Sequence, residues 1–380
     1  MTYLIVSAVL LLVVALFHLV AGLVIANGLY RGAILVGPKR WDLSVRVRRV
    51  SKNSIDLESP TPRQDIGHPG RLGLRWSEGY AQLGEVIAVE GAAITREYNR
   101  VEGGDPPVCD GPLDQCTPIE LDSYFYPHGP GDVGLRFEEV VYDSPLGPIG
   151  AWLVPADPGT RWAVHCHGWT AERRELVRLL PSFHVNGITS LVIDYRNDPG
   201  APLDPTGRYR FGLTEWEDLE AAVRISLERG ADDIVLTGCS TGGAVVLSFL
   251  ENSELAEHVV AVVLDAPNVI VIDTVRHATR DSRGTRLMKE FGFWIADLRW
   301  GIDWETTNYV QRADRYLHVP TLVFHGTSDH TVPISESQQL AHRVPDLVRL
   351  VETPAAGHVM SWNAEPERYE RYLVGFLGGL

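Results

Sequence analysis

The chain opens with a long run of apolar residues. Residues 3–26 are YLIVSAVLLLVVALFHLVAGLVIA and carry no charged side chain. A helix of about 20 such residues crosses a bilayer core of about 30 Å, and a globular helix has no need to be apolar on every face. Apart from the amino terminus nothing basic precedes the run, unlike in a secretory signal. We therefore expect a retained transmembrane anchor within residues 1–30, with a cleaved signal or a hydrophobic hairpin as the alternatives.

A different pattern, short stretches of alternating polar and apolar residues, follows the apolar run. Residues 43–51 (LSVRVRRVS) and 84–98 (GEVIAVEGAAITREY) alternate in this way, and Gly and Pro clusters separate them. Such alternation is typical of short strands with one buried face. The pattern predicts a juxtamembrane stretch and a small β-rich segment over 31–134, to which we assign no chemistry.

From about residue 135 apolar runs of strand length alternate with helix-like segments. The expected strands are 137–143, 150–156, 162–168, 188–195, 233–239, 259–266, 321–326 and 348–354, and the expected helical segments are 171–185, 214–231, 242–252, 335–344 and 365–377. Strands separated by helices of this length imply a mostly parallel sheet covered on both faces. An insert rich in Trp interrupts the alternation at 268–316.

The composition is that of an ordinary folded protein, with 45% hydrophobic and 22% charged residues among 380. It excludes wholesale disorder and a polytopic membrane protein, and the net charge of −15 argues against a nucleic-acid partner. The first 52 residues carry seven basic side chains and one acid, so they are positive while the remainder is strongly acidic. Because the basic residues follow the apolar run, the positive-inside rule predicts a single-pass protein with a cytoplasmic body. The lipid bilayer is the partner expected for residues 3–26.

Two of the four cysteines bear on this topology. Cys109 and Cys116 lie in a Pro/Gly/Asp-rich stretch and are close enough to bridge, and a bridge would indicate an oxidising compartment. Whether they pair is left open. Cys166 and Cys239 fall in apolar runs and are expected to be buried thiols.

The pentapeptide Gly238-Cys239-Ser240-Thr241-Gly242 stands where an expected strand meets an expected helix. This is the G-x-S-x-G pattern in the strand–turn–helix setting that exposes a serine nucleophile at the top of a sheet. A glycine on each side is needed because the chain turns tightly there. The motif predicts that Ser240 is a nucleophile and that Cys239 is a packed neighbour.

A serine nucleophile needs a base and an acid that orients the base. Asp329 follows the expected strand at 321–326, and His358 follows the strand at 348–354. The carboxyl ends of parallel strands meet at one edge of a sheet, so Ser240, Asp329 and His358 are expected to converge. Asp265, just past another strand, is a second candidate acid.

The developing oxyanion also needs hydrogen-bond donors. We expect the backbone N–H groups of Thr241, directly after the nucleophile, and of Trp169, in the loop after the strand at 162–168. Gly168 lets that loop turn inward, and His167 is expected to brace it by hydrogen bonding.

With these motifs the chain resembles the α/β-hydrolase superfamily over about residues 135–380. The resemblance rests on His167-Gly168, the G-x-S-x-G pentapeptide, the block from His325 to Asp329 with Val332-Pro333, and Gly357-His358. Asp194-Tyr195-Arg196 is similar to a stretch found in serine-aminopeptidase-like and prolyl-oligopeptidase-like hydrolases. The resemblance implies an α/β-hydrolase fold with a helical lid at about 268–316 and a Ser-His-Asp mechanism through an acyl-enzyme. It implies no particular substrate, because the fold hosts many chemistries.

The lid region is crowded with aromatic side chains at Phe291, Phe293, Trp294, Trp300 and Trp304. They either pack the lid on the body or form an acyl-binding wall over Ser240, with Phe291, Trp294 and Trp300 as candidate substrate contacts.

The sequence predicts a membrane-anchored serine hydrolase that cleaves a small acyl ester. A peptidase acting on short peptides and a catalytically inactive binding module are the alternatives. No metal-ligand spacing and no phosphate-binding glycine loop stands out, so we expect no cofactor.

Overall fold

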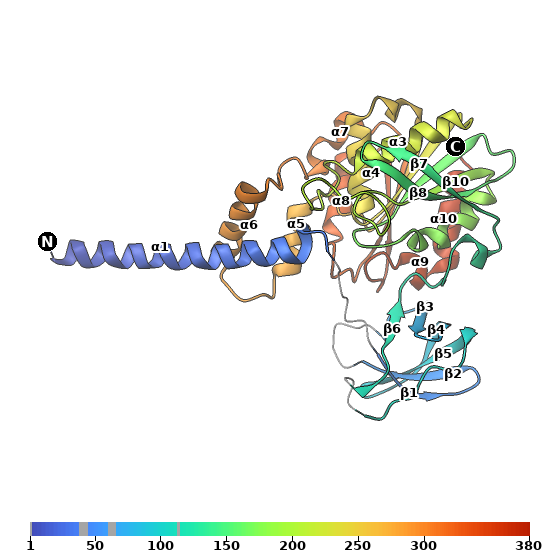
Figure 1. Cartoon of the computed structure of the whole chain (residues 1–380), viewed down its shortest axis with the longest axis horizontal. Helices are drawn as coiled ribbons and strands as arrows, with labels where there is room; N and C mark the ends of the chain where they lie inside the picture. Colours follow the sequence, from blue (N-terminus) through green and yellow to red (C-terminus); the bar gives the residue numbers. More distant parts are fainter. Residues whose placement is uncertain (1, 38–44, 60–65, 112–114) are drawn as a thin grey trace.

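The computed structural model describes residues 2–37, 45–59, 66–111 and 115–380 (Figure 1). Its N-terminal helix α1 (Thr2–Leu29) projects away from the body and passes through a π-helical turn (Tyr30–Ile34) into the rest of the chain. The most apolar stretch within Ile5–Ile34 has a mean hydropathy of 2.9, and only 6% of that stretch is buried. Within the described ranges this helix alone has the length and composition to cross a membrane. Lys39 and Arg40, two of the basic residues behind the topology prediction, lie outside the described residues.

The β-rich segment forms one antiparallel sheet with the strand order β1-β2-β5-β4-β3-β6. Its strands are β1 (Arg46–Val50), β2 (Ser54–Glu58), β3 (Leu72–Trp76), β4 (Gly79–Glu90), β5 (Ala93–Gly103) and β6 (Ile119–Asp122). Alternate side chains such as Val47, Leu57 and Leu83 fill its own small core, as the alternation in the sequence predicted. Cys109 and Cys116 are joined by a disulfide after β5.

The larger body is an eight-stranded sheet with the order β14-β13-β12-β11-β9-β10-β8-β7. The strands are β7 (Glu138–Ser144), β8 (Gly147–Val154), β9 (Arg161–Cys166), β10 (Ile188–Ile193), β11 (Asp233–Cys239), β12 (Val259–Asp265), β13 (Thr321–Gly326) and β14 (Val348–Thr353). From β10 to β14 all neighbours are parallel, whereas β8 and β7 are added antiparallel. The mostly parallel sheet expected from the sequence is thereby confirmed.

Helices cover both faces of this sheet, which explains why its central strands are apolar along their whole length. The helices are α2 (Leu180–His184), α3 (Trp216–Glu228), α4 (Thr241–Asn252), α8 (Ser335–Arg343), α9 (Ser361–Ala364) and α10 (Pro366–Leu377). Along β11, Leu236 joins the core shared with α3 and α4, while the adjacent Val235 joins the core shared with α2 and α10. The insert contributes α5 (Val271–Thr279), α6 (Arg286–Trp300), a 3-10 turn (Tyr309–Arg312) and α7 (Ala313–Tyr316).

The charged stretch at 171–185 differs from the amphipathic helix that the sequence suggests. It forms a 3-10 segment over Arg173–Leu179 and only a short α2, and Arg174, Glu175 and Arg178 are buried. Each buried charge has a tertiary partner: Arg174 pairs with Asp122 of β6, for example. The stretch connects the two sheets, and every side chain from Arg174 to Leu180 is buried.

Candidate active site

Ser240 lies in the turn between β11 and α4, with φ 50° and ψ −119°. A residue other than glycine seldom adopts a positive φ, so the surrounding packing must impose this conformation. A Cβ on Gly238 would lie 2.5 Å from the carbonyl oxygen of Gly242, and a Cβ on Gly242 would collide with the carbonyl oxygen of Cys166. The glycine requirement inferred from the motif thus has a steric origin in the structure.

The structure brings the three residues expected at the sheet edge into one hydrogen-bonded line. Ser240 Oγ lies 2.9 Å from His358 Nε2, and His358 Nδ1 lies 2.7 Å from Asp329 Oδ2. In the tautomer that satisfies both contacts, Nδ1–H donates to the carboxylate and the Ser240 hydroxyl donates to Nε2. Ser240 is 8% exposed and the His358 side chain 23% exposed, so the line opens to solvent at its reactive end.

Asp329 is held on all sides. Its Oδ1 accepts hydrogen bonds from the N–H groups of Thr331 and Val332, and His325 Nε2 lies 3.3 Å from Oδ2. Burial alone would raise the pKa of Asp329, but the charges and hydrogen bonds of His358 and His325 outweigh it and lower that pKa. Asp329 is therefore a carboxylate at neutral pH. Conversely, burial alone would lower the pKa of His358, but its contact with Asp329 raises it.

Asp265, the second candidate acid, is placed differently. It ends β12, and its Oδ2 accepts a hydrogen bond of 3.2 Å from the hydroxyl of Tyr369. Burial raises the pKa of Asp265 to about 6. It is Asp329 that the structure brings to His358, so Asp265 is assigned to the core.

The two expected oxyanion donors flank Ser240. Thr241 begins α4, so its N–H is one of the helix N-terminal donors that have no partner within the helix. On the other side, a Cβ on Gly168 would lie 3.1 Å from Ser240 Cβ, which places the loop that carries Trp169 against the nucleophile. The N–H of Gly168 donates to Glu175 Oε2 at 2.8 Å, and the oxyanion role of the Trp169 N–H stays a prediction.

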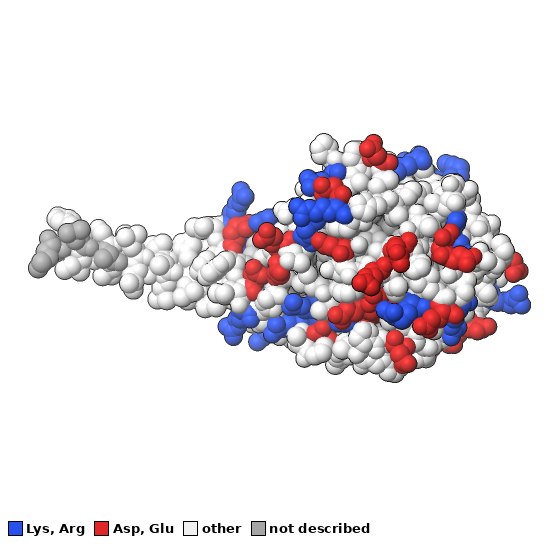
Figure 2. Space-filling model, turned by 90° about the horizontal axis from the view of Figure 1, so that it is seen from above, with Lys and Arg blue, Asp and Glu red and all other residues white. Residues whose placement is uncertain are grey.

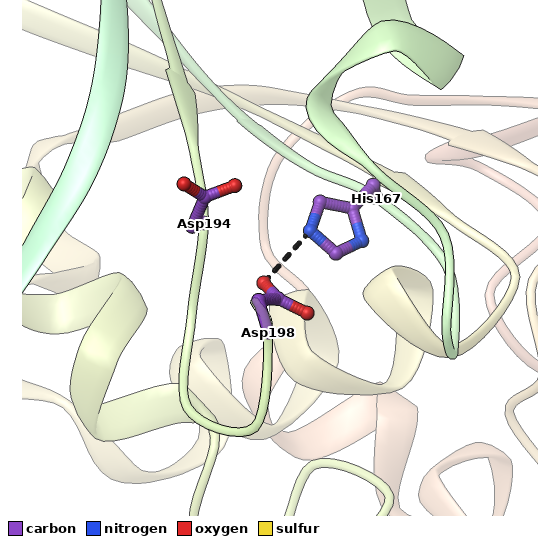
Figure 3. Close-up of side chains that lie close together, drawn as sticks. All are labelled: His167, Asp194 and Asp198. Carbon is purple, nitrogen blue, oxygen red and sulfur yellow. Dashed lines mark hydrogen bonds and ion pairs between the residues drawn. The ribbon is translucent and has the colours of Figure 1, made fainter. Parts of the chain in front are cut away.

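His167, the residue before Gly168, belongs with Asp194 and Asp198 to a group that offers metal-ligating atoms (Figure 3). Both imidazole nitrogens of His167 are engaged, Nε2 with Asp198 Oδ2 at 3.0 Å and Nδ1 with the carbonyl of Gly168 at 2.9 Å. Burial alone would lower the pKa of His167, but Asp198 outweighs it and raises the pKa to about 9. A protonated imidazole has no lone pair for a metal. His167 and Asp198 thus form an ion pair, and His167 braces the loop after β9 through the carbonyl of Gly168, the role expected of it.

The histidine loop receives support that the sequence did not reveal. His68 Nε2, from the β-rich segment, accepts a hydrogen bond of 3.0 Å from the N–H of Gly357, next to His358. The backbone N–H of Arg71 donates to the carbonyl of Asn363, and the Asn363 side chain donates back to the carbonyl of Arg71. Nothing in the spacing of these residues signals a contact across almost 300 positions. The β-rich segment, to which we assigned no chemistry, thus touches the site.

The aromatic residues of the insert contact the N-terminal helical segment, as the packing alternative suggested. Phe291 lies against Gly22 of α1, and Trp300 stacks on Tyr30 at 4.4 Å. Trp294 stacks on Phe291 at 5.4 Å and is 55% exposed. Among the described residues these side chains contact α1, the π-helical turn after it and one another. Their contact with a substrate stays a prediction.

Two family profiles match the chain. Residues 163–371 match the alpha/beta hydrolase family (Abhydrolase_6), and residues 46–110 match a domain of unknown function (DUF8805). The first match spans every residue of the Ser240–His358–Asp329 line, and the second covers most of the β-rich sheet.

The chain is also similar to individual proteins. It is 22% identical over 276 residues to the uncharacterized protein YfhR of Escherichia coli O157:H7, which covers 68% of this chain and 87% of YfhR. The esterase Pf2001 of Pyrococcus furiosus superposes with TM-scores of 0.52 and 0.53 in two crystal forms at 18% identity. The first form covers 72% of this chain and 98% of the esterase. At that identity the likeness concerns the fold. The family match over more than half of its length shows that this chain belongs to the alpha/beta hydrolase family.

Proposed function

We propose that the chain is a serine hydrolase that cleaves a carboxylic ester through an acyl-enzyme. The observation that carries the proposal is the unbroken line from Ser240 Oγ through His358 to Asp329, with contacts of 2.9 and 2.7 Å. Had His358 been several ångströms beyond reach of Ser240, an inactive binding module would be favoured. The contact of 2.9 Å between Ser240 and His358 therefore gives no support to an inactive binding module.

The residues divide the chemistry as follows. His358 Nε2 takes the hydroxyl proton as Ser240 Oγ bonds to the substrate carbonyl carbon, and the N–H groups of Thr241 and Trp169 stabilise the oxyanion. His358 then gives the proton to the departing alkoxide. Water next attacks the acyl-enzyme, transferring its proton to His358 Nε2, and Ser240 leaves as the hydroxyl. Asp329 holds His358 in the required tautomer throughout.

A fluorophosphonate probe tests the nucleophile, since it forms a covalent bond with an activated serine. We expect the full-length protein to be labelled and the Ser240→Ala variant not to be. Cys239→Ala is the matched control, because the neighbouring thiol is fully buried and should leave labelling intact. Equal labelling of wild type and Ser240→Ala would overturn the proposal. Comparing p-nitrophenyl acyl esters with amino-acid p-nitroanilides then separates an esterase from a peptidase.

We further propose that residues 1–30 are a retained membrane anchor, that 31–134 connect it to the catalytic domain and that the catalytic domain spans 135–380. A cleaved signal would remove the face of α1 at Gly22 and Ala26, which is buried in the folded protein. Its removal would expose the apolar partner surface on α6. Retention of α1 keeps that surface covered.

The orientation of the anchor is a separate proposal. The basic residues after α1 favour a cytoplasmic catalytic domain. The Cys109–Cys116 disulfide is the opposing observation, since disulfides persist in oxidising compartments. If added protease digests the catalytic domain only after cell lysis, the domain is cytoplasmic. Digestion in intact cells would show that the domain faces the outside.

A further inference from the structure

Helix α6 of the insert is packed directly on the membrane-anchor helix α1. A Cβ on Gly22 would lie 2.7 Å from Phe291 Cδ1, and a Cβ on Gly292 would lie 2.7 Å from Ile25 Cγ2. Ala26, one turn beyond Gly22, is fully buried. Small residues four apart allow two helices to approach closely, as in membrane helix pairs. Because of this fit α6 is held at a fixed position along α1.

The face of α6 next to this contact is apolar and exposed. Leu287, Trp294 and Leu298 are 66%, 55% and 73% exposed, and their spacing of seven and four residues places them on one side of the helix. A cavity of about 350 Å³ lies between α1 and the C-terminal end of α6. It is lined by Val20, Leu23, Val24, Asn27, Arg299 and Trp300. The exposed apolar surface of α1 therefore continues onto α6.

The position of the crossing corresponds to the border of a bilayer. Gly22 and Ala26 lie near the end of the apolar run, and Tyr30 stacks on Trp300 just beyond it. Trp and Tyr side chains gather at the level of the lipid headgroups. At about 1.5 Å per residue, Ala26 lies about 6 Å and Gly22 about 12 Å from Tyr30 along the helix axis, a range that includes the ~5–10 Å to which interfacial helices are buried.

The charged side chains around α6 are also consistent with a position at the level of the lipid headgroups. Residues 271–300 carry six basic and four acidic side chains, in a body that is otherwise acidic. Arg283, Arg286 and Arg299 are exposed. Figure 2 shows that the described surface of the projecting part of α1 is free of charged side chains and that both basic and acidic side chains begin to appear where it meets the body. Basic groups at this level would contact lipid phosphates.

The insert is also tied to the reactive serine. The N–H of Asn268, at its start, donates to the carbonyl of Ser240 at 2.9 Å. Glu336 accepts hydrogen bonds from the N–H groups of Val269 and Ile270, which fixes the entry into α5. The insert that carries α6 is thus joined to Ser240 at its first residues, ahead of α5.

We propose that α6 is a second membrane-contacting element, whose row of Leu287, Trp294 and Leu298 enters the lipid layer beside α1 and presents Ser240 to acyl esters dissolved in the bilayer. The occupant of this surface is lipid, because the surface is continuous with the anchor helix. This inference rests on the proposed function for the substrate and on α1 as an anchor for the membrane.

A fluorescent label tests the contact without reference to activity. The full-length protein is reconstituted in vesicles of phosphatidylcholine and phosphatidylglycerol, with the environment-sensitive dye NBD on Leu298→Cys or Leu287→Cys. The native free cysteines, Cys166 and Cys239, are buried and do not compete for the dye. Val185→Cys is the matched control, since Val185 is an apolar residue that is 70% exposed on the body.

We expect lipids carrying a doxyl quencher to reduce NBD emission at positions 287 and 298 several-fold more than at 185. Equal quenching at all three positions would overturn the proposal. In a second assay the double variant Leu287→Asp/Leu298→Asp should lose roughly tenfold in rate on a long-chain ester held in vesicles, while its rate on soluble p-nitrophenyl acetate stays unchanged. Val185→Asp should alter neither rate, and a double variant with an unchanged rate on the vesicle ester would contradict the presentation of lipid substrates.

The two proposals fail in different ways. A wild-type protein that hydrolyses no ester but shows quenching at 287 and 298 would refute the proposed function and leave the membrane contact standing. A protein that is active on soluble esters but shows no preferential quenching would refute only the membrane contact.

Discussion

The turn around Ser240 and the loop that carries His358 lie at the same edge of one sheet, yet different parts of the chain hold them. The serine turn is fixed by its own neighbours, the glycines at 238 and 242 and the end of β9. The histidine loop is fixed from outside the family domain, through His68 and the Arg71–Asn363 hydrogen bonds. One half of the site is therefore local in origin, whereas the other depends on the β-rich segment.

Arg178, from the larger body itself, adds a second support to the histidine loop. Its guanidinium donates to Asn363 Oδ1 at 2.7 Å and to the carbonyl of Val359 at 2.8 Å, next to His358. Met360 packs on the core of the β-rich sheet. The segment from 357 to 363 is consequently clamped between the two sheets. A defect in the β-rich segment should disturb the base and leave the nucleophile in place.

The largest effect is expected at the acid that orients the base. Asp329→Asn should lower kcat on a p-nitrophenyl ester by about 10⁴-fold, because an amide no longer holds His358 in the tautomer that accepts the serine proton. Asp265→Asn is the matched control, an acid of the neighbouring strand, and should cost less than tenfold. Similar losses in the two variants would show that Asp265 shares the role.

The local half of the site can be broken by a single methyl group. Gly242→Ala should destabilise the protein by about 3 kcal/mol, because its Cβ would collide with the backbone of Cys166. Denaturant unfolding of the full-length protein measures this loss. Gly375→Ala in α10, where nothing lies near the added carbon, serves as the control. An unaltered unfolding midpoint for Gly242→Ala would contradict the steric origin of the glycine.

The remote half is tested at His68, which we regard as a positioning residue. His68→Ala should lower kcat by roughly tenfold with little change in KM, since one hydrogen bond to the histidine loop is worth about 1 to 1.5 kcal/mol. His68→Gln should restore part of the rate, because its side-chain oxygen can accept the Gly357 N–H. His128→Ala, at an exposed histidine outside this contact, should behave as wild type. If His68→Ala changed only KM and the stability of the protein, and His68→Gln did not restore the rate, His68 would have a purely structural role.

The smallest expected effect is a shift in the pH dependence of kcat/KM when Asp329 is replaced. Only neutral His358 can accept the serine proton, so kcat/KM should fall as the pH drops through the pKa of His358. Asp329 raises that pKa above the ordinary value of 6.5, which places the midpoint of the loss above pH 6.5. In Asp329→Asn the charge is removed, and the midpoint should move to lower pH. A midpoint that is the same in both proteins would show that another group titrates.

Much of the catalytic domain could be predicted from the sequence. The strands ending at Cys239, Gly326 and Thr353 occur as expected, and the chain order of Ser240, Asp329 and His358 led to the residues that the structure brings together. The spacing of the apolar runs and the G-x-S-x-G motif were enough to predict this, because a parallel sheet places the carboxyl ends of its strands at one edge. The stretch at 171–185 was less predictable, since its charges are paired across the two sheets and so lack a helical solvent face.

What the sequence determined by itself is what depends on neighbouring residues or on regular alternation: the apolar helix α1, the sheet, and the glycines that let the chain turn at Ser240. Only the tertiary structure decided which partner each isolated side chain meets. It joined His68 to Gly357, assigned Asp265 to Tyr369, and laid the aromatics of α6 against α1. The physical reason is that hydrogen bonds and packing act over a few ångströms in space, whatever the separation of their partners along the chain.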